Sequence, residues 1–539
     1  MTDKTDTDRL AEIARLATVD LGSASSLAEQ ALAEGVAAPW LYGLVGLALK
    51  SKGRFEEAIL AFGKALEHET ENASLMTKVG LCLLELGRRQ EAAQVLGVAV
   101  KLDPQSPEAS FAYGWAAENL GALDSAKSAW ERATRLDPDR ADALAGLSGL
   151  AARRRDWQEA RRLGERAAAL DPDLTDAPMN LARVEVGLGD FDAAERRLKA
   201  LIARPNLKPQ VRANARILLG DVFDANERYD EAFASYSEGK SDFRAQHAER
   251  FRNSERPSSI EIVRAMSAEF IETPEAAWRL PEWPLTHGPA RGHAFLIGFP
   301  RSGTTLIEQV IATHPDMEAL GERPVMIDAE TEFLTRAGGI ARLADTMSDL
   351  LEPYRNAYWL RAREFGVIPT GKVFVDKHPF STMRLPLLSK VFPEAKIIFA
   401  LRDPRDVVLS CFRRSFNINA NTFQFTELAS TAELYDVMMT AGELYLSRLP
   451  LQVHRLRYEA LVADFEAEGR ALCEFLGVEW TEDLKEFATT QRAIATPSST
   501  QVRRGLYEEG VGQWRRYARF LEPVMPRLAP WIEKFGYEA

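Results

Sequence analysis

The sequence predicts a multi-domain protein in which an α-helical repeat array, an α-solenoid, precedes an α/β domain built on a parallel sheet. Two patterns lead to this prediction. An alanine recurs at a fixed interval through the first half, and two apolar runs in the second half are each followed by a polar loop and a helix. The 539 residues also exceed what one core supports, since single cores stop growing at about 250–300 residues.

The composition indicates a folded protein, with 46% hydrophobic and 27% charged residues. A formal net charge of −12 argues against a general nucleic-acid binder, because such binding needs accumulated Lys and Arg. We expect no membrane span and a cytoplasmic location, since neither a signal peptide nor a run of about 18 apolar residues is present. Cys82, Cys411 and Cys473 are far apart and are expected to be buried thiols.

A helix pair repeats through the first half. The recurring alanines are Ala58, Ala92, Ala126, Ala160 and Ala194, and twelve residues before them stand Gly46, Gly80, Gly114, Ser148 and Ala182. Small residues at both positions allow the two helices of a unit to approach closely. A sixth unit carries Gly220 and Ala232. This period of 34 residues resembles the tetratricopeptide repeat, a solenoid that offers a concave binding surface and no chemistry of its own.

Four larger side chains fall at positions that line the groove in this repeat family: Leu81, Phe111, Trp115 and Met179. Each is equally compatible with packing between neighbouring helices. The register ends near residue 245, and a Pro-rich stretch follows. We therefore expect a repeat array with an N-terminal cap over residues 1–245, a connector over 246–290 and an α/β domain over 291–539.

The loop after the first apolar run has the composition of an anion site. HAFLIGF at 293–299 suits a buried parallel strand, and TTLIEQVIATH at 304–314 has helical spacing. Between them the loop and helix start supply Arg301, Ser302, Gly303, Thr304 and Thr305. A strand, a tight loop and a helix N-terminus together direct N–H groups at a bound anion. No lysine precedes the threonines, so this is not the nucleoside-triphosphatase loop.

A second apolar run, KIIFAL at 396–401, ends at Arg402 and is followed by a helix that contains Ser410. We expect these two residues to bind another anionic group some distance from the first loop. Two anion sites on one sheet fit a nucleotide with phosphate at both the 5′ and 3′ positions of its ribose.

The paired motifs resemble a known family. PRSGTTLIEQVIATHP and FALRDPRDVVLS, in this order, resemble the 5′- and 3′-phosphosulfate-binding elements of sulfotransferases, and residues 454–480 resemble their later helical stretch. The resemblance covers about 290–539 and is nearest the tyrosylprotein branch. It implies a P-loop-like domain that uses 3′-phosphoadenosine 5′-phosphosulfate as its co-substrate, without a metal.

The resemblance also implies roles for single residues. Glu322, 21 residues after Arg301, corresponds to the base, and Lys377 in VDKHPF to the group that stabilises charge on the leaving oxygen. His378 is the second candidate for the base, because cytosolic relatives use histidine. A later donor-binding segment corresponds to Ser498, Gln501, Val502 and Trp514, with Arg503 and Arg504 as additional positive charge.

Two departures from the tyrosylprotein pattern leave the acceptor open. Arg323-Pro324 replaces Glu-Thr after Glu322, and Gln513 stands where the branch has a lysine. We expect the acceptor to be a hydroxyl of a peptide, protein, saccharide or small molecule, with a peptide tyrosine as one candidate, and the repeats to bind that acceptor or a protein partner.

Two alternative functions remain. One is a repeat scaffold with an inactive nucleotide-binding domain, against which the retained Arg301, Glu322 and Lys377 argue. The other is a kinase-like P-loop enzyme in which Asp376 binds magnesium, against which the missing loop lysine argues.

Overall fold

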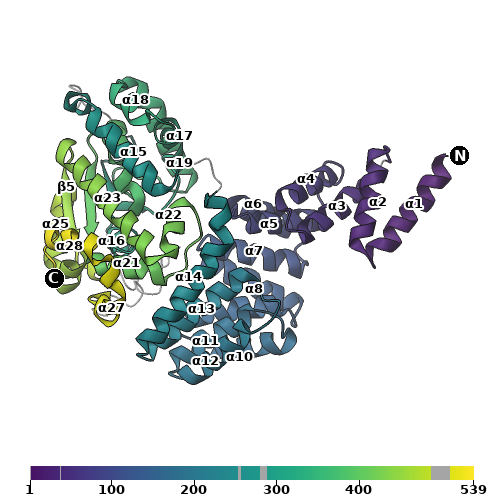
Figure 1. Ribbon diagram of the computed structural model, residues 1–539. Coiled ribbons are helices and arrows are strands. Elements are labelled where there is room, and N and C mark those ends of the chain that lie inside the picture. The colour runs from purple at the N-terminus through teal and green to yellow at the C-terminus, as the bar shows by residue number, and fades with distance from the viewer. Residues whose placement is uncertain (1, 37, 253–256, 280–287, 487–509, 539) are drawn as a thin grey trace. The chain divides into compact units, whose positions relative to one another are not determined.

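The computed structural model describes residues 2–36, 38–252, 257–279, 288–486 and 510–538 (Figure 1). Within these residues the chain divides into two compact units, one that extends to Leu201 and one that begins at Ile202. The division lies before the expected boundary near residue 245, so the last helix pair of the repeat pattern groups with the C-terminal part.

The first unit consists of helices in antiparallel pairs, as the repeat pattern predicts. Their bounds are α1 (Thr2–Ala17), α2 (Leu21–Ala33), α3 (Trp40–Ser51), α4 (Phe55–Leu66), α5 (Ala73–Glu85), α6 (Arg89–Leu102), α7 (Pro107–Asn119), α8 (Leu123–Leu136), α9 (Ala141–Arg153), α10 (Trp157–Leu170), α11 (Asp176–Gly187) and α12 (Phe191–Ile202). The 34-residue period therefore corresponds to one helix hairpin, which confirms the α-solenoid.

Glycines let the two helices of a hairpin approach closely. A Cβ atom added to Gly46 would lie 2.6 Å from the Phe62 ring, and one added to Gly114 would lie 2.5 Å from the Trp130 ring. Each of these large residues stands four positions after a recurring alanine, and the alanines themselves are fully buried. The repeated small residue thus leaves room for a large side chain of the partner helix.

Three of the four side chains considered for the groove pack against the core of the array. Leu81, Phe111 and Trp115 are partly buried and pack against the apolar core of the array. The Arg140 guanidinium also lies over the Phe111 ring, 4.9 Å from its centroid. Met179 is partly buried as well.

The second unit begins with another helix pair, α13 (Pro209–Ala225) and α14 (Tyr229–Arg252). It repeats the same device, since a Cβ on Gly220 would lie 2.6 Å from the Tyr236 ring. Helix α15 (Ser259–Glu272) follows and begins with a capping box between Ser258 and Glu261.

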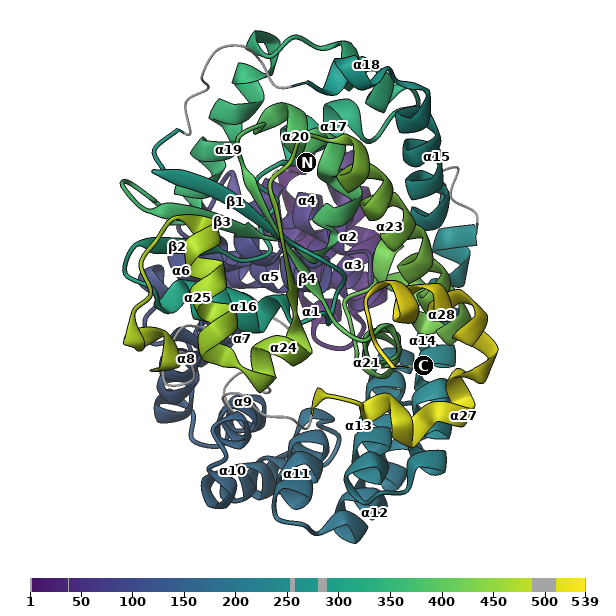
Figure 2. The ribbon, with the colours of Figure 1, turned by 90° about the vertical axis from the view of Figure 1, so that its left-hand side faces the viewer.

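A five-stranded parallel sheet forms the centre of this unit (Figure 2). Its strands are β1 (Gly292–Ile297), β2 (Met317–Leu320), β3 (Val373–Lys377), β4 (Lys396–Leu401) and β5 (Val453–Arg457), in the order β2-β3-β1-β4-β5. All four strand pairs are parallel, and β1 lies between β3 and β4. The apolar runs predicted as buried strands are β1 and β4, and both are almost entirely buried.

Helices surround the sheet: α16 (Thr304–Thr313), α17 (Ile327–Phe333), α18 (Gly339–Asp345), α19 (Glu352–Glu364), α20 (Leu385–Val391), α21 (Pro404–Arg413), α22 (Ala420–Phe423), α23 (Leu428–Arg448), α24 (Tyr458–Ala463), α25 (Phe465–Leu476), α27 (Ala518–Leu521) and α28 (Met525–Lys534). Helix α16 contacts β1, β2 and β3, and α24 and α25 contact β5. Among the described helices, none is both long and apolar enough to cross a bilayer.

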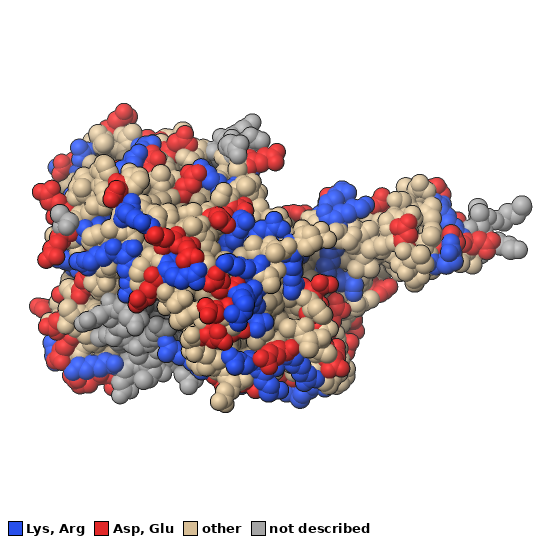
Figure 3. Space-filling view, turned by 60° about the horizontal axis from the view of Figure 1, so that its bottom comes forward, with Lys and Arg blue, Asp and Glu red and all other residues tan. Residues whose placement is uncertain are grey.

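Surface charge is mixed in the view of Figure 3, where basic and acidic side chains are interspersed. Many of them form short ion pairs along a helix, such as Arg162 with Glu159 at 2.6 Å. The three cysteines are buried free thiols, as expected.

Candidate active site

The site lies where the strand order reverses, at the carboxyl ends of β1 and β4. In open parallel sheets, ligands bind at this position because the loops from the two adjacent strands leave in opposite directions. The loop after β1 has positive φ angles at Arg301 (73°) and Gly303 (97°). A Cβ on Gly303 would lie 2.7 Å from Tyr458 Cδ2, so glycine is required for both conformation and space.

The predicted anion loop leads directly into helix α16. Ser302, Thr304 and Thr305 are all buried around the start of this ten-residue helix. The first N–H groups of a helix have no intrahelical partner, and the helix dipole makes this end positive. The Ser302 hydroxyl is buried and has no hydrogen-bond partner among the described residues. The loop thus offers hydrogen-bond donors that a bound anion can accept from.

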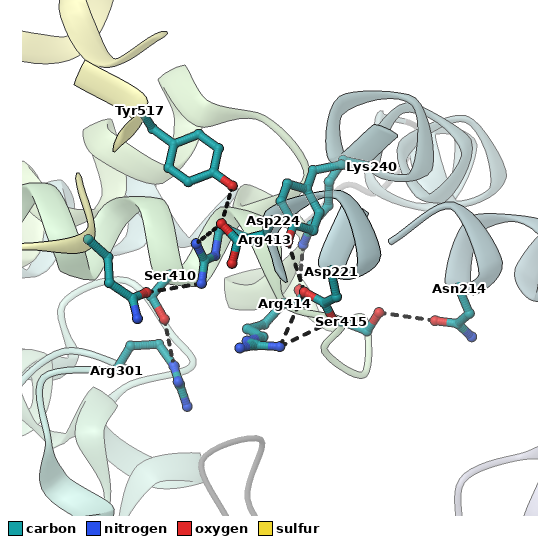
Figure 4. A network of polar contacts seen from close by, with 12 residues as sticks. Asn214, Asp221, Asp224, Lys240, Arg301, Ser410, Arg413, Arg414, Ser415 and Tyr517 are labelled. Carbon is teal, nitrogen blue, oxygen red and sulfur yellow. Dashed lines mark hydrogen bonds and ion pairs between the residues drawn. The ribbon is translucent and has the colours of Figure 1, made fainter. Parts of the chain in front are cut away.

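The two expected anion clusters are in direct contact rather than some distance apart. Arg301 Nε donates to Ser410 Oγ at 2.9 Å (Figure 4). Arg402 Nη1 donates to the Arg301 carbonyl at 3.0 Å. The adjacency of β1 and β4 brings the loops after these strands together. A ligand with two anionic groups would therefore meet one continuous basic surface.

Arg402 also contacts the C-terminal segment that begins at Gly510. Its Nη2 donates to the Gly510 carbonyl, and its guanidinium lies 4.8 Å from the Tyr458 ring centroid. Arg402 Nε is buried without a hydrogen-bond partner among the described residues. One donor of this side chain therefore remains for a ligand.

Asp406 and Arg405 fix the segment around Trp514. Asp406 accepts from the backbone N–H of Gly512 at 2.7 Å and of Trp514 at 2.8 Å, while Arg405 lies 3.7 Å from the Trp514 ring centroid. Arg405 is itself held by Asp403 through two hydrogen bonds of 3.0 and 2.8 Å. The predicted site residue Trp514 thus lies beside helix α21. Its indole N–H is buried with no acceptor among the described residues.

The predicted catalytic pair lies at the ends of neighbouring strands. Lys377 Nζ donates to Glu322 Oε1 at 2.7 Å and lies 3.1 Å from Glu308 Oε2. The Lys377 side chain is fully buried, whereas that of Glu322 is 43% exposed. Burial acts to lower the pKa of Lys377, but the two carboxylates outweigh it and raise the pKa. The lysine is therefore positively charged, and Glu322 is accessible from solvent.

His378 and Asp376 flank the lysine and differ in environment. Burial, together with Arg384 and Lys377, holds the pKa of His378 well below its usual value, so its imidazole is neutral. Burial raises the pKa of Asp376 to about 7, although Tyr358 donates a hydrogen bond of 3.1 Å to its carboxylate. Asp376 is thus enclosed beside a tyrosine. Among the described residues, no group of three His, Cys, Asp or Glu is arranged to hold a metal ion.

Both parts of the chain match models of known protein families. Residues 294–482 match the model of the sulfotransferase family, and residues 44–107, 83–150 and 179–245 match tetratricopeptide repeat models. The chain carries a sulfotransferase-family domain.

Several curated relatives are similar to this chain at low identity. An uncharacterized protein of Aquifex aeolicus is 26% identical over 360 residues, which are 65% of this chain and 46% of that protein. Protein-tyrosine sulfotransferase 1 is 26% identical in Danio rerio and 27% in Homo sapiens, over 45% of this chain and 72% and 69% of those proteins. The chain thus spans about half the length of the Aquifex aeolicus relative.

Among solved structures, a tetratricopeptide repeat protein from Parabacteroides merdae aligns with 44% of this chain and 93% of its own, at 18% identity and a TM-score of 0.36. MamA aligns with 30% of this chain and 88% of its own, at 26% identity and a TM-score of 0.26.

Part of the predicted donor site of the sulfotransferase domain is not described. Ser498, Gln501, Val502, Arg503 and Arg504 lie outside the described residues. Sequence reasoning, in turn, missed Glu308, Asp406 and Tyr458. Glu308 stands inside an apolar helical run, and only the packing of α16 against β1, β2 and β3 brings it to Lys377. No motif in the sequence signals that contact.

Proposed function

We propose that the chain transfers a sulfuryl group from 3′-phosphoadenosine 5′-phosphosulfate to a hydroxyl acceptor, with a peptide tyrosine as the preferred acceptor. The observation that carries this proposal is the Lys377–Glu322 pair at 2.7 Å, one strand away from the Arg301 loop. Lys377 pairs in register with Leu296, two residues before the loop begins. A charged lysine and an accessible carboxylate thus flank an anion loop.

The residues present fit the donor nucleotide. The loop from Arg301 to Thr305 and the start of α16 would hold the 5′-phosphosulfate, which the Ser302 hydroxyl supports, since it has no partner within the described part of the chain. Arg402 and Ser410 would hold the 3′-phosphate, which Arg402 Nε supports, since no described residue accepts from it. Trp514 stands on the same surface as a flat apolar group for the adenine side.

The reaction is a displacement at sulfur. Glu322 takes the proton of the acceptor hydroxyl while the acceptor oxygen bonds to sulfur and the bond from sulfur to the bridging oxygen breaks. Lys377 stabilises the negative charge that collects on that bridging oxygen. Glu308 keeps Lys377 charged in its buried position, since a buried ammonium needs a paired carboxylate.

The acceptor is proposed from the relatives. Proteins named protein-tyrosine sulfotransferase match this domain, which supports a peptide tyrosine. The tetratricopeptide repeats support a macromolecular acceptor or a protein partner, because such arrays present extended surfaces for binding.

Transfer of label from a sulfur-labelled donor tests the proposal. The full chain is incubated with the labelled donor and, in separate reactions, with two peptides, one of which has a phenylalanine where the other has a tyrosine. Label on the tyrosine peptide alone, without added metal, is the expected result. Magnesium-dependent transfer of phosphate from ATP, with no transfer of label, would contradict the proposal and favour the kinase-like alternative.

A further inference from the structure

Helix α21 joins the proposed nucleotide site to the last helix pair of the repeat pattern. Its Ser410 contacts Arg301 Nε at 2.9 Å, and Arg413, one turn later, lies 3.5 Å from Asp224 on α13 (Figure 4). All three helices, α13, α14 and α21, belong to the same compact unit. A single short helix therefore carries Ser410, a residue of the proposed nucleotide site, and one turn later Arg413, which pairs with α13.

Asp224 anchors two parts of the site. Its Oδ1 pairs with the buried Arg413 and also accepts a hydrogen bond from the Tyr517 hydroxyl. Arg413 in turn donates to Gln513 Oε1 at 3.0 Å. Asp224 thus holds both α21 and the C-terminal segment from Gly510 to Tyr517.

That segment touches the nucleotide site at its other end. Arg402 donates to the Gly510 carbonyl, and Asp406 accepts from the N–H groups of Gly512 and Trp514. A displacement of the segment at Tyr517 would therefore pass along the segment to Gly510, and from Gly510 to Arg402. Of the two contacts of Asp224, one is with Arg413, three residues after Ser410, and the other is with Tyr517, in the segment whose Gly510 contacts Arg402.

Several side-chain contacts join the helix pair to α21, to the residue that follows it and to α27. Lys240 Nζ, on α14, donates to the Arg414 carbonyl at the end of α21 at 2.7 Å. Arg414 lies 3.4 Å from Asp221, and the Phe233 ring stacks on Phe520 at 4.0 Å and packs on Phe412 at 5.5 Å. A close-packed surface of this kind transmits a displacement, because it has little room to absorb one.

We infer that Asp224 is a positioning residue of the nucleotide site, which sets Ser410 and Arg402 for the 3′-phosphate through Arg413 and Tyr517. The last helix pair is then a working part of the catalytic unit rather than only the end of the repeat array. The identity of the ligand in this inference rests on the proposed function.

The test compares two nucleotides that differ only in the 3′-phosphate. Calorimetry of the full chain gives the Kd for adenosine 3′,5′-bisphosphate and for adenosine 5′-monophosphate, for wild type and for Asp224→Asn. We expect the Kd of the bisphosphate to rise about tenfold, as loss of one charged contact implies, and that of the monophosphate to change less than twofold. Glu238→Gln is the matched control, because Glu238 pairs with Arg216 inside the same helix pair.

Two further variants separate positioning from folding. Tyr517→Phe removes one hydroxyl and should raise the bisphosphate Kd about threefold, and Asp224→Glu should restore most of the wild-type value. An equal loss for both nucleotides, or no loss for either, would overturn the role of Asp224. A wild-type chain that does not prefer the bisphosphate would instead overturn the donor assignment itself, and with it this inference.

Discussion

Lys377 and Glu322 stand 55 residues apart in the chain, yet their side chains meet at 2.7 Å. The parallel pairing of β2 with β3 explains the contact, since Leu320 is in register with Asp376, Lys377 is the last residue of β3 and Glu322 stands two residues after the end of β2. Glu308 completes the cluster from helix α16. The sheet register, rather than any local motif, assembles the proposed base beside the proposed charge stabiliser.

Glu308 is predicted to keep Lys377 charged. Glu308→Gln removes one of the two carboxylates that raise the pKa of this lysine, so burial should then lower it. We expect the alkaline limb of the pH–rate profile to move to lower pH, because the neutral lysine no longer stabilises the leaving oxygen. Glu318→Gln is the control, since Glu318 on β2 pairs at 3.7 Å with Lys372, which stands just before β3. Identical profiles for Glu308→Gln and wild type would refute this role.

Arg301 and Arg402 are predicted to act as a coupled pair. Each Arg→Ala change should weaken binding of adenosine 3′,5′-bisphosphate by about 1.5–3 kcal/mol, the range of hydrogen bonds to charged groups. Arg402 donates to the backbone carbonyl of Arg301 and so helps to hold the Arg301 loop in place. Arg402→Ala should therefore also displace the Arg301 side chain, and the double variant should lose less than the sum of the two single losses. Calorimetric Kd values for all four proteins measure this, and strict additivity would show that the two arginines act independently.

The limits of the catalytic unit can be tested by truncation. Deletion of residues 1–201 should retain nucleotide binding, whereas deletion of 1–245 should lose most of it, because the latter removes the helix pair that holds Arg413. Circular dichroism and thermal unfolding would establish that each shortened chain is folded before its Kd is measured. Equal nucleotide affinity in both would place the functional boundary at 245 instead.

The raised pKa of Asp376 predicts that the stability of the fold depends on pH. Its folded pKa of about 7 exceeds the ordinary value of 3.8, chiefly because of burial, so the folded chain holds a proton that the unfolded chain releases between these pH values. This contribution is complete below about pH 4 and is lost as the pH rises towards 7. The Tm of Asp376→Asn relative to wild type should therefore rise between pH 5 and pH 8.

Asp328→Asn is the control for this pH dependence, because Arg361 holds the pKa of Asp328 below its usual value and its titration ends before pH 5. Its Tm relative to wild type should stay constant over the same interval. A constant difference for Asp376→Asn as well would show that Asp376 ionises normally.

Much of the fold was predictable because it repeats or follows local rules. The alanine and glycine spacing predicts the helix hairpins, and the apolar runs at 293–299 and 396–401 predict β1 and β4. The motifs indicated Arg301, Glu322 and Lys377 as candidate site residues, and their roles stay predictions, while the contact between Glu322 and Lys377 was not predicted. Long-range packing was not predictable: the contact of Arg301 with Ser410, the burial of Glu308 beside Lys377 and the attachment of α21 to Asp224 depend on which surfaces meet.

One departure from the family pattern can be related to a side-chain contact in the structure. Gln513, which stands where the tyrosylprotein branch has a lysine, accepts a hydrogen bond from the buried Arg413. A lysine there would place a second positive charge against that guanidinium. The sequence showed the substitution but not the partner that accounts for it.

The measurement that tests the central claim most directly compares wild type with Glu322→Gln on the same labelled donor and tyrosine peptide. The account predicts that turnover falls by about 10²–10⁴-fold, the usual contribution of a positioned base, while the Kd for adenosine 3′,5′-bisphosphate stays within about twofold. His378→Ala, measured in parallel, should retain most of the turnover, since burial and the neighbouring Arg384 and Lys377 lower the pKa of His378 and make it a weak proton acceptor. Full activity of Glu322→Gln together with loss of activity in His378→Ala would contradict the account and assign the base to the histidine.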